Sequence, residues 1–182
     1  MHRALLSIAA AGCLALALAL SGGAARAQGV AMGVDGWDRS VAPTGTVFYR
    51  CTAPASCGQG SVASYRQQPN GPLPSLAVFR AQNESINRRM VEGSGGRVLS
   101  VDLIEIAESE VARAKVQTAI KAINHSDGRR EYLATSVFSD GERHYSLVST
   151  AAGEPMARAN LQAFLPVVML AAQIGGKPAP AR

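Results

Sequence analysis

The sequence predicts an α+β domain in which an amphipathic helix and an apolar C-terminal helix pack on an antiparallel β-meander. Runs of β-branched and aromatic residues separated by turn signals fill residues 98–150, which predicts the meander. Helical patterns at residues 75–93 and 154–174 stand on either side of it in the chain. Upstream, Cys51 and Cys57 lie six positions apart around a Pro- and Gly-rich turn, which predicts an N-terminal hairpin stapled by a disulfide.

The first 27 residues have the pattern of a secretory signal peptide. A basic start at Arg3 leads into an apolar stretch at 4–20 and then into a small-x-small sequence at 25–27. We therefore expect a periplasmic or secreted protein that is cleaved before Gln28. Lipid attachment at Cys13 fits the preceding residues poorly, and the uninterrupted apolar run is shorter than the roughly 20 residues that a membrane anchor needs.

The mature chain has the size of one domain and a weak positive charge. Removing 27 of the 182 residues leaves 155, enough to bury a hydrophobic core. Arg3 and Arg26 leave with the signal, so 16 basic and 13 acidic residues remain and the net charge is +3. The basic residues alternate with acids and form no stripe with aromatic residues between them, so we expect no nucleic-acid partner.

The two cysteines of the mature chain are best explained as a structural disulfide. An exported domain commonly carries such a bridge, and Cys51 and Cys57 leave no unpaired thiol. A redox pair usually has two intervening residues, whereas five intervene here. A zinc site needs two further ligands, and His125 and His144 have no ligand spacing. We therefore expect no metal and no cofactor.

The residues on either side of the cysteines predict a hairpin. Residues 46–50 and 61–67 are rich in β-branched and aromatic side chains and are bounded by Gly, Pro and Ser. Residues 28–45 are Gly-rich and weakly patterned, so we expect an irregular arm, with Trp37 anchoring it to the body of the protein by burying its ring. The folded domain is expected to span residues 46–174.

A turn-rich linker at 69–75 precedes the amphipathic helix, which Ser75 can cap and which we expect to end at Gly93. The predicted buried stripe is Leu76, Phe79, Asn83, Ile86 and Met90. Charged residues lie four apart on another face, which is most simply a solvated surface. A partner surface formed by Arg80, Arg88 and Arg89 is the alternative.

The meander is built from strand patterns and turns. Residues 98–108 form a strand pattern whose register slips near Leu103, which predicts a bulge. Residues 111–123 fit both a helix and a strand. We assign them to a strand, because the turn at 126–128 and the hairpin signal at 140–141 define two further strands, and an isolated hairpin is marginally stable.

The C-terminal helix begins at Glu154 and Pro155 and is apolar nearly all round, with a kink expected at Pro166. Its apolar side chains are Leu161, Phe164, Leu165, Val167, Val168, Met169 and Leu170. We expect this helix to be the core helix on the sheet, although a stripe this wide also leaves open contact with a second copy or a partner. Residues 175–182 are expected to be a disordered tail.

This order of elements resembles the PsbP-like and DcrB-like group of exported or lumenal α+β domains. The resemblance covers roughly residues 75–173 and lies in the topology around SDGERHYSLVST, at 139–150, and the helix NLQAFLPVV, at 160–168. It includes no diagnostic residue motif and carries over no binding or catalytic residue. It implies a non-enzymatic accessory protein of the cell envelope.

A small periplasmic hydrolase that uses His125 or His144 is the alternative. His125 lies in the turn sequence Asn-His-Ser-Asp, where these residue types are favoured because they bond their own backbone. The acids that could assist a histidine are Asp102, Glu105, Glu108, Asp127 and Asp140. The sequence contains no phosphate-binding glycine loop, no His-Glu-x-x-His and no Gly-x-Ser-x-Gly. We therefore favour a binding or accessory protein and assign no catalytic residue.

Overall fold

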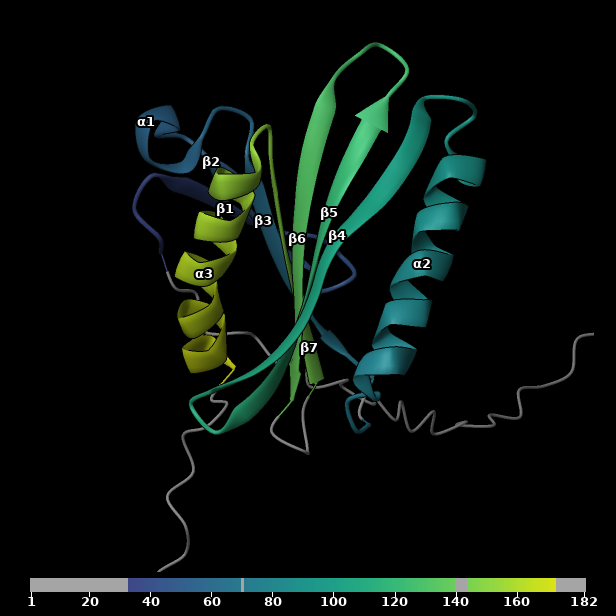
Figure 1. The fold of residues 1–182 in the computed structure, drawn as a ribbon. Coiled ribbons are helices and arrows are strands. Elements are labelled where there is room, and N and C mark those ends of the chain that lie inside the picture. The colour runs from purple at the N-terminus through teal and green to yellow at the C-terminus, as the bar shows by residue number, and fades with distance from the viewer. Residues whose placement is uncertain (1–32, 70, 140–143, 173–182) are drawn as a thin grey trace, which may run out of the picture.

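The computed structural model describes residues 33–69, 71–139 and 144–172. Seven antiparallel strands form one sheet in the order β1-β2-β3-β7-β6-β5-β4. The sheet lies between helices α2 and α3 (Figure 1). The strands are β1 (Trp37–Val41), β2 (Val47–Cys51), β3 (Val62–Gln68), β4 (Val98–Val111), β5 (Ala114–His125), β6 (Arg130–Ser139) and β7 (His144–Ala151), and the helices are α1 (Pro54–Cys57), α2 (Leu76–Gly93) and α3 (Glu154–Ala171).

The predicted four-stranded meander is confirmed, because β4, β5, β6 and β7 pair in sequence order. The ambiguous segment is a strand: β5 pairs along its whole length with β4 on one side and with β6 on the other. The predicted irregularity near Leu103 is a register shift between Leu103 and Glu105. The turn at 126–128 is present, with Gly128 at φ 83°. The hairpin signal at 140–141 lies outside the described residues.

β4 ends at Val111, three residues later than predicted, and the turn that follows it lies within the predicted strand 111–123. It consists of Ala112 and Arg113, at φ 47° and φ 68°. A two-residue turn in which both residues have positive φ is of type I′, which matches the twist of the flanking strands. Neither side chain favours that conformation, so no turn signal appears in the sequence at this position.

Replacing Ala112 and Arg113 by Asn and Gly should raise the free energy of unfolding by about 1 kcal/mol. The left-handed conformation costs roughly 1–2 kcal/mol per residue with a Cβ, and part of this gain is offset by the greater freedom of glycine in the unfolded chain. Urea unfolding measures the change. Arg113→Ala is the control, because it keeps a Cβ and should give no gain; an Asn-Gly chain no more stable than this control would contradict the prediction.

Residues 37–41 form strand β1, although this segment was expected to belong to an irregular arm, so that expectation was wrong here. β1 pairs with β2 from Trp37, opposite Cys51, to Val41, opposite Val47. It is an edge strand, and its sequence WDRSV has too many polar residues to predict a strand. Trp37 packs against the core, with its ring perpendicular to that of Phe164 and the centroids 4.9 Å apart. Residues 37–41 therefore form a strand because they pair with β2, and not because of their own strand propensity.

The stapled hairpin is confirmed. β2 and β3 are antiparallel, and Cys51 and Cys57 form a disulfide with a Cα–Cα distance of 5.8 Å. The connection contains the short helix α1, which the sequence did not predict and which has Pro54 in its first turn. Asn160 of α3 donates a hydrogen bond from Nδ2 to the carbonyl oxygen of Cys57 at 2.9 Å. The bridged loop is therefore also tied to the C-terminal helix.

Replacing both cysteines by alanine should lower the free energy of unfolding by about 2 kcal/mol, because the bridge removes the loop-closure entropy of the unfolded chain. The loop is short, with a sequence separation of 6, so the loss stays at the low end of the usual range. Urea unfolding with and without a reductant measures it, and the alanine variant should not respond to reductant. Rapid labelling of both thiols in the native protein would contradict the disulfide.

Helix α3 covers the face of the sheet that holds the main core. Phe164 and Val168 are buried together with Tyr49, Ile120 and Leu147 from the sheet, as expected for a core helix. Arg158 of α3 forms an ion pair with Glu105 of β4 at 2.8 Å, which ties the helix to the edge strand of the sheet. Pro166 lies inside the helix.

Helix α2 packs on the opposite face, over β4 and β5. Ser75 caps it by accepting a hydrogen bond from the Val78 N–H, and its last residue is Gly93, as predicted. The predicted stripe was only partly right: Phe79 and Asn83 are buried, whereas two of its apolar members, Leu76 and Ile86, are exposed. Asn87, and not Ile86, is the next buried residue of the helix after Asn83. α2 lies near the edge of the sheet, where a single strand pair offers little apolar surface to cover.

No helix in the described part of the chain is long and apolar enough to cross a membrane. The predicted signal peptide at 1–27 and the predicted tail at 175–182 lie outside the described residues.

Candidate functional site

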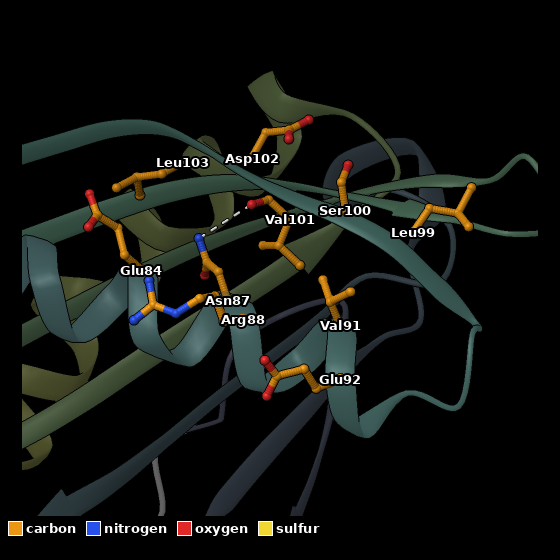
Figure 2. A pocket seen from close by; sticks show the side chains of 10 residues that line it. All are labelled: Glu84, Asn87, Arg88, Val91, Glu92, Leu99, Ser100, Val101, Asp102 and Leu103. Carbon is orange, nitrogen blue, oxygen red and sulfur yellow. Dashed lines mark hydrogen bonds between the residues drawn. The ribbon is translucent and has the colours of Figure 1, made fainter.

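A groove of about 660 Å³ runs between helix α2 and strand β4 (Figure 2). β4 is the last strand of the sheet, so one of its edges has no neighbouring strand in the described structure. From α2 the groove is lined by Glu84, Asn87, Arg88, Val91 and Glu92, and from β4 it is lined by Leu99, Ser100, Val101, Asp102 and Leu103. Its position between a helix and a free strand edge makes it the candidate functional site.

Asn87 is the polar residue at the base of the groove and is only 6% exposed. Its Nδ2 donates a long hydrogen bond of 3.5 Å to the carbonyl oxygen of Val101. Its Oδ1 is buried and receives no hydrogen bond in the described structure. A buried acceptor without a donor costs roughly 1–3 kcal/mol, so an occupant that donates to this oxygen would remove an existing penalty.

The charged residues of the groove are mainly acidic. Glu84, Glu92 and Asp102 carry three carboxylates and Arg88 carries one guanidinium, so the local charge at neutral pH is negative, although the chain as a whole is positive. Asp102 and Ser100 both accept hydrogen bonds from the side-chain amide of Asn124, at 2.9 and 2.7 Å. These contacts fix the two β4 side chains at the sheet edge.

The groove also contains apolar surface. Leu99 is exposed and lies at a register shift between Val98 and Ser100, where the extra residue of a bulge interrupts regular pairing with β5. Val91 and Leu103, which also line the groove, are half-buried. The lining therefore combines apolar contacts, an unpaired acceptor and acidic groups. Its one hydroxyl, that of Ser100, has an amide rather than a general base as its described partner.

A second, smaller hollow of about 370 Å³ surrounds the turn that contains His125. Its lining residues are Ser94, Arg97, Val98, His125, Ser126, Asp127 and Arg129. Nε2 of His125 lies 3.5 Å from a carboxylate oxygen of Glu131, without hydrogen-bond geometry. Asp127 is paired with Arg129 at 2.6 Å, which holds the pKa of that carboxyl below its usual range. The structure thus brings His125 next to an acid, but the acid is Glu131, which the sequence did not single out.

His144 belongs to a different part of the sheet. It begins β7 opposite Ser139, which pairs in turn with Lys115 of β5. His125 lies ten residues further along β5, or about 33 Å at the rise of a strand. Burial lowers the pKa of His144 below its ordinary value, so the imidazole is neutral at pH 7. The two histidines cannot contribute to one catalytic site.

The remaining sequence candidates are dispersed. Glu105 pairs with Arg158, Glu108 accepts a hydrogen bond from Gln117, and Asp140 lies outside the described residues. Arg80, Arg88 and Arg89 are all exposed, and only Arg88 lines the groove. Among the described residues no group of three or more His, Cys, Asp or Glu side chains could hold a metal ion.

Lys121 is a buried charged residue that sequence reasoning missed. It is 2% exposed, lies between Leu103 and Leu133 in the register of the sheet, and has no hydrogen bond or ion pair among the described residues. Burial lowers the pKa of its ammonium group to about 8. The signal was available: Lys121 alternates with Ala119 and Ile123, so it stands at an apolar position of a central strand.

No protein-family model matches the chain, and no curated protein matches its sequence. The solution structure of cyanobacterial PsbP (CyanoP) from Synechocystis sp. PCC 6803 is similar to it, with 11% sequence identity, a TM-score of 0.50, and coverage of 78% of this chain and 81% of that one. The Pseudomonas aeruginosa protein of unknown function PA94 is 15% identical with a TM-score of 0.43, over 81% of this chain and 89% of that one. That TM-score is too low to support an inference. The likeness to CyanoP shows the fold alone: the chain has a PsbP-like α+β fold, as the resemblance noted in its sequence implied.

Proposed function

We propose that this protein is an exported, non-enzymatic accessory or binding protein of the cell envelope that acts through its surfaces. The observation that carries the proposal is the α2–β4 groove. Its lining offers contacts suited to binding, with acidic groups, exposed and half-buried apolar side chains and a buried acceptor that has no donor among the described residues. The described contacts of its one hydroxyl include no general base.

Two further features support export. The Cys51–Cys57 disulfide is stable in an oxidising compartment such as the periplasm or the cell exterior and is uncommon in a reducing cytosol. The first 27 residues have the composition of a signal peptide with a cleavage site after Ala27. N-terminal mass spectrometry of the protein recovered from cells should give a chain beginning at Gln28. A chain that begins at Met1 would contradict export with cleavage.

The alternative is a hydrolase, and the observation that favours it is the 3.5 Å distance between His125 Nε2 and a carboxylate oxygen of Glu131. A variant that carries both His125→Ala and His144→Ala distinguishes the two functions. The wild-type protein and this variant are each immobilised and incubated with envelope extract of the cells that make the protein. We expect both to retain the same proteins and to restore the same envelope phenotype in cells that lack the gene. Loss of the phenotype in the histidine variant, with its fold intact by circular dichroism, would favour an enzyme instead.

A further inference from the structure

The α2–β4 groove follows the free edge of the sheet itself. Val101 directs its carbonyl oxygen towards Asn87 of α2, and in an extended strand the N–H and C=O of one residue point to the same side. The backbone groups of Val101 therefore point away from β5. Ser100 and Asp102, which both bond Asn124, lie on the face opposite to that of Val101, because successive side chains alternate. Because the groove is lined by consecutive residues of β4 whose side chains point to opposite faces of the sheet, it includes the backbone edge of β4 that lies between those faces.

A free strand edge beside a helix is the geometry that accepts an added strand. An extended segment laid along such an edge gains main-chain hydrogen bonds from the strand, while the helix wall contacts its side chains. Asn87 adds a specific requirement, since its Oδ1 is buried in the groove and no described residue donates a hydrogen bond to it. The hydrogen bond from its Nδ2 to the Val101 carbonyl oxygen is long, at 3.5 Å. A backbone N–H of an added strand can replace Nδ2 as the donor to that carbonyl.

The charge of the groove indicates the chemistry of the occupant. Glu84 and Glu92 lie eight residues apart along one side of α2, and Asp102 lines the groove from β4, on the face of the strand opposite to that of Val101. Only Arg88 opposes them. Lys and Arg side chains on an added strand would meet these carboxylates at the rim, where complementary charge speeds association and fixes register.

We propose that the α2–β4 groove binds an extended basic segment of a partner protein, which joins the outer edge of β4 as an added strand. The proposal rests on the proposed function, because it names the class of partner that the binding protein recognises. A second copy of the chain fits poorly, since antiparallel pairing of two β4 edges would bring Asp102, Glu105 and Glu108 of each copy towards those of the other. The chain's own residues 175–182 include prolines, which cannot donate to a strand.

The test uses the chain from residue 28 to 182 and a displayed library of random ten-residue peptides. We expect the selected peptides to be rich in Lys and Arg and to contain no proline at their centre. A synthetic copy of the most enriched peptide, added to the isotopically labelled protein, should shift the amide resonances of residues 99–103 and of α2. Selection of acidic or proline-rich peptides, or shifts confined to another surface, would overturn the proposal even if the protein still retains envelope partners.

Charge variants make the test specific. Glu84→Lys combined with Glu92→Lys should weaken the peptide about tenfold, which corresponds to 1.4 kcal/mol. Both residues are exposed, so these changes should leave the fold intact. Glu110→Lys is the control, because Glu110 is exposed on β4, the strand that borders the groove, but lies outside the groove; the affinity of this variant for the peptide should stay within twofold of wild type. Equal loss in both variants would overturn the site. Removal of residues 173–182 should leave the affinity unchanged, whereas a large gain would identify that segment as the occupant instead.

Discussion

Replacing Phe164 by alanine should lower the free energy of unfolding by about 3–5 kcal/mol and leave a poorly folded protein. Phe164 is 1% exposed, and its ring contacts those of Trp37 and Tyr49 at centroid distances of 4.9 and 4.8 Å. The substitution removes this apolar contact and leaves a cavity that the sheet and the helix cannot close. A loss of this size approaches the whole stability of an ordinary domain.

The matched control for Phe164 is Leu170→Ala on the same helix. Leu170 is 66% exposed, so its truncation should change the free energy of unfolding by no more than about 0.5 kcal/mol. Urea unfolding followed by circular dichroism measures both variants, and sedimentation measures their size. If Phe164→Ala kept the stability of the wild type but dissociated an oligomer or lost its partner, α3 would be an interface rather than the core helix.

The contrast between these two residues shows how far the sequence could predict α3. The apolar stripe indicated a buried helix, but it runs nearly all round and cannot say which side faces the sheet. Phe164 and Leu170 are both large apolar residues of one helix, and only the tertiary structure separates them. Both ends of α2 and the start of α3 were easier to predict, because Ser75, Gly93 and Pro155 act through local backbone chemistry.

The strands were predictable where local signals existed. β5, β6 and β7 have alternating or continuous apolar runs, and their neighbours in the meander follow from sequence order. β1 was missed because the polar sequence WDRSV becomes a strand only through pairing with β2. The turn at Ala112 was misplaced for a related reason: the paired strands on either side impose positive φ on residues that do not favour it.

The candidate site could not be predicted from the residues alone. Glu84, Arg88 and Glu92 were expected to form a solvated face, and they are exposed. The groove exists because α2 lies beside the free edge of β4. This is a tertiary arrangement that no local sequence pattern predicts. Asn87 was overlooked because Ile86 is the more apolar neighbour in the predicted stripe, yet Asn87 is the residue that points inwards.

Lys121→Met should raise the free energy of unfolding at pH 7 by roughly 2–3 kcal/mol. Lys121 is buried without a partner among the described residues, and burial lowers the pKa of its ammonium group to about 8, from an ordinary value of 10.5. At pH 7 both the folded and the unfolded chain hold the proton, so the folded state bears the full cost of the buried charge. Methionine has a similar length and no charge, and it should fill the same space between Leu103 and Leu133.

The same substitution should remove a specific pH dependence. As pH rises from about 8 towards 10.5, the folded chain releases the Lys121 proton while the unfolded chain still holds it, so the stability of the wild type rises with pH. Measurements should stop near pH 9.5, because burial raises the pKa of Tyr65, which lowers the stability once unfolded tyrosine ionises above pH 10. Lys115→Met is the control on the same strand: its side chain is 71% exposed, so both the stability and its pH dependence should stay as in the wild type. A Lys121→Met chain that is less stable than wild type at pH 7, or that keeps the rise between pH 8 and 9.5, would show that the ammonium group has a stabilising partner in solution.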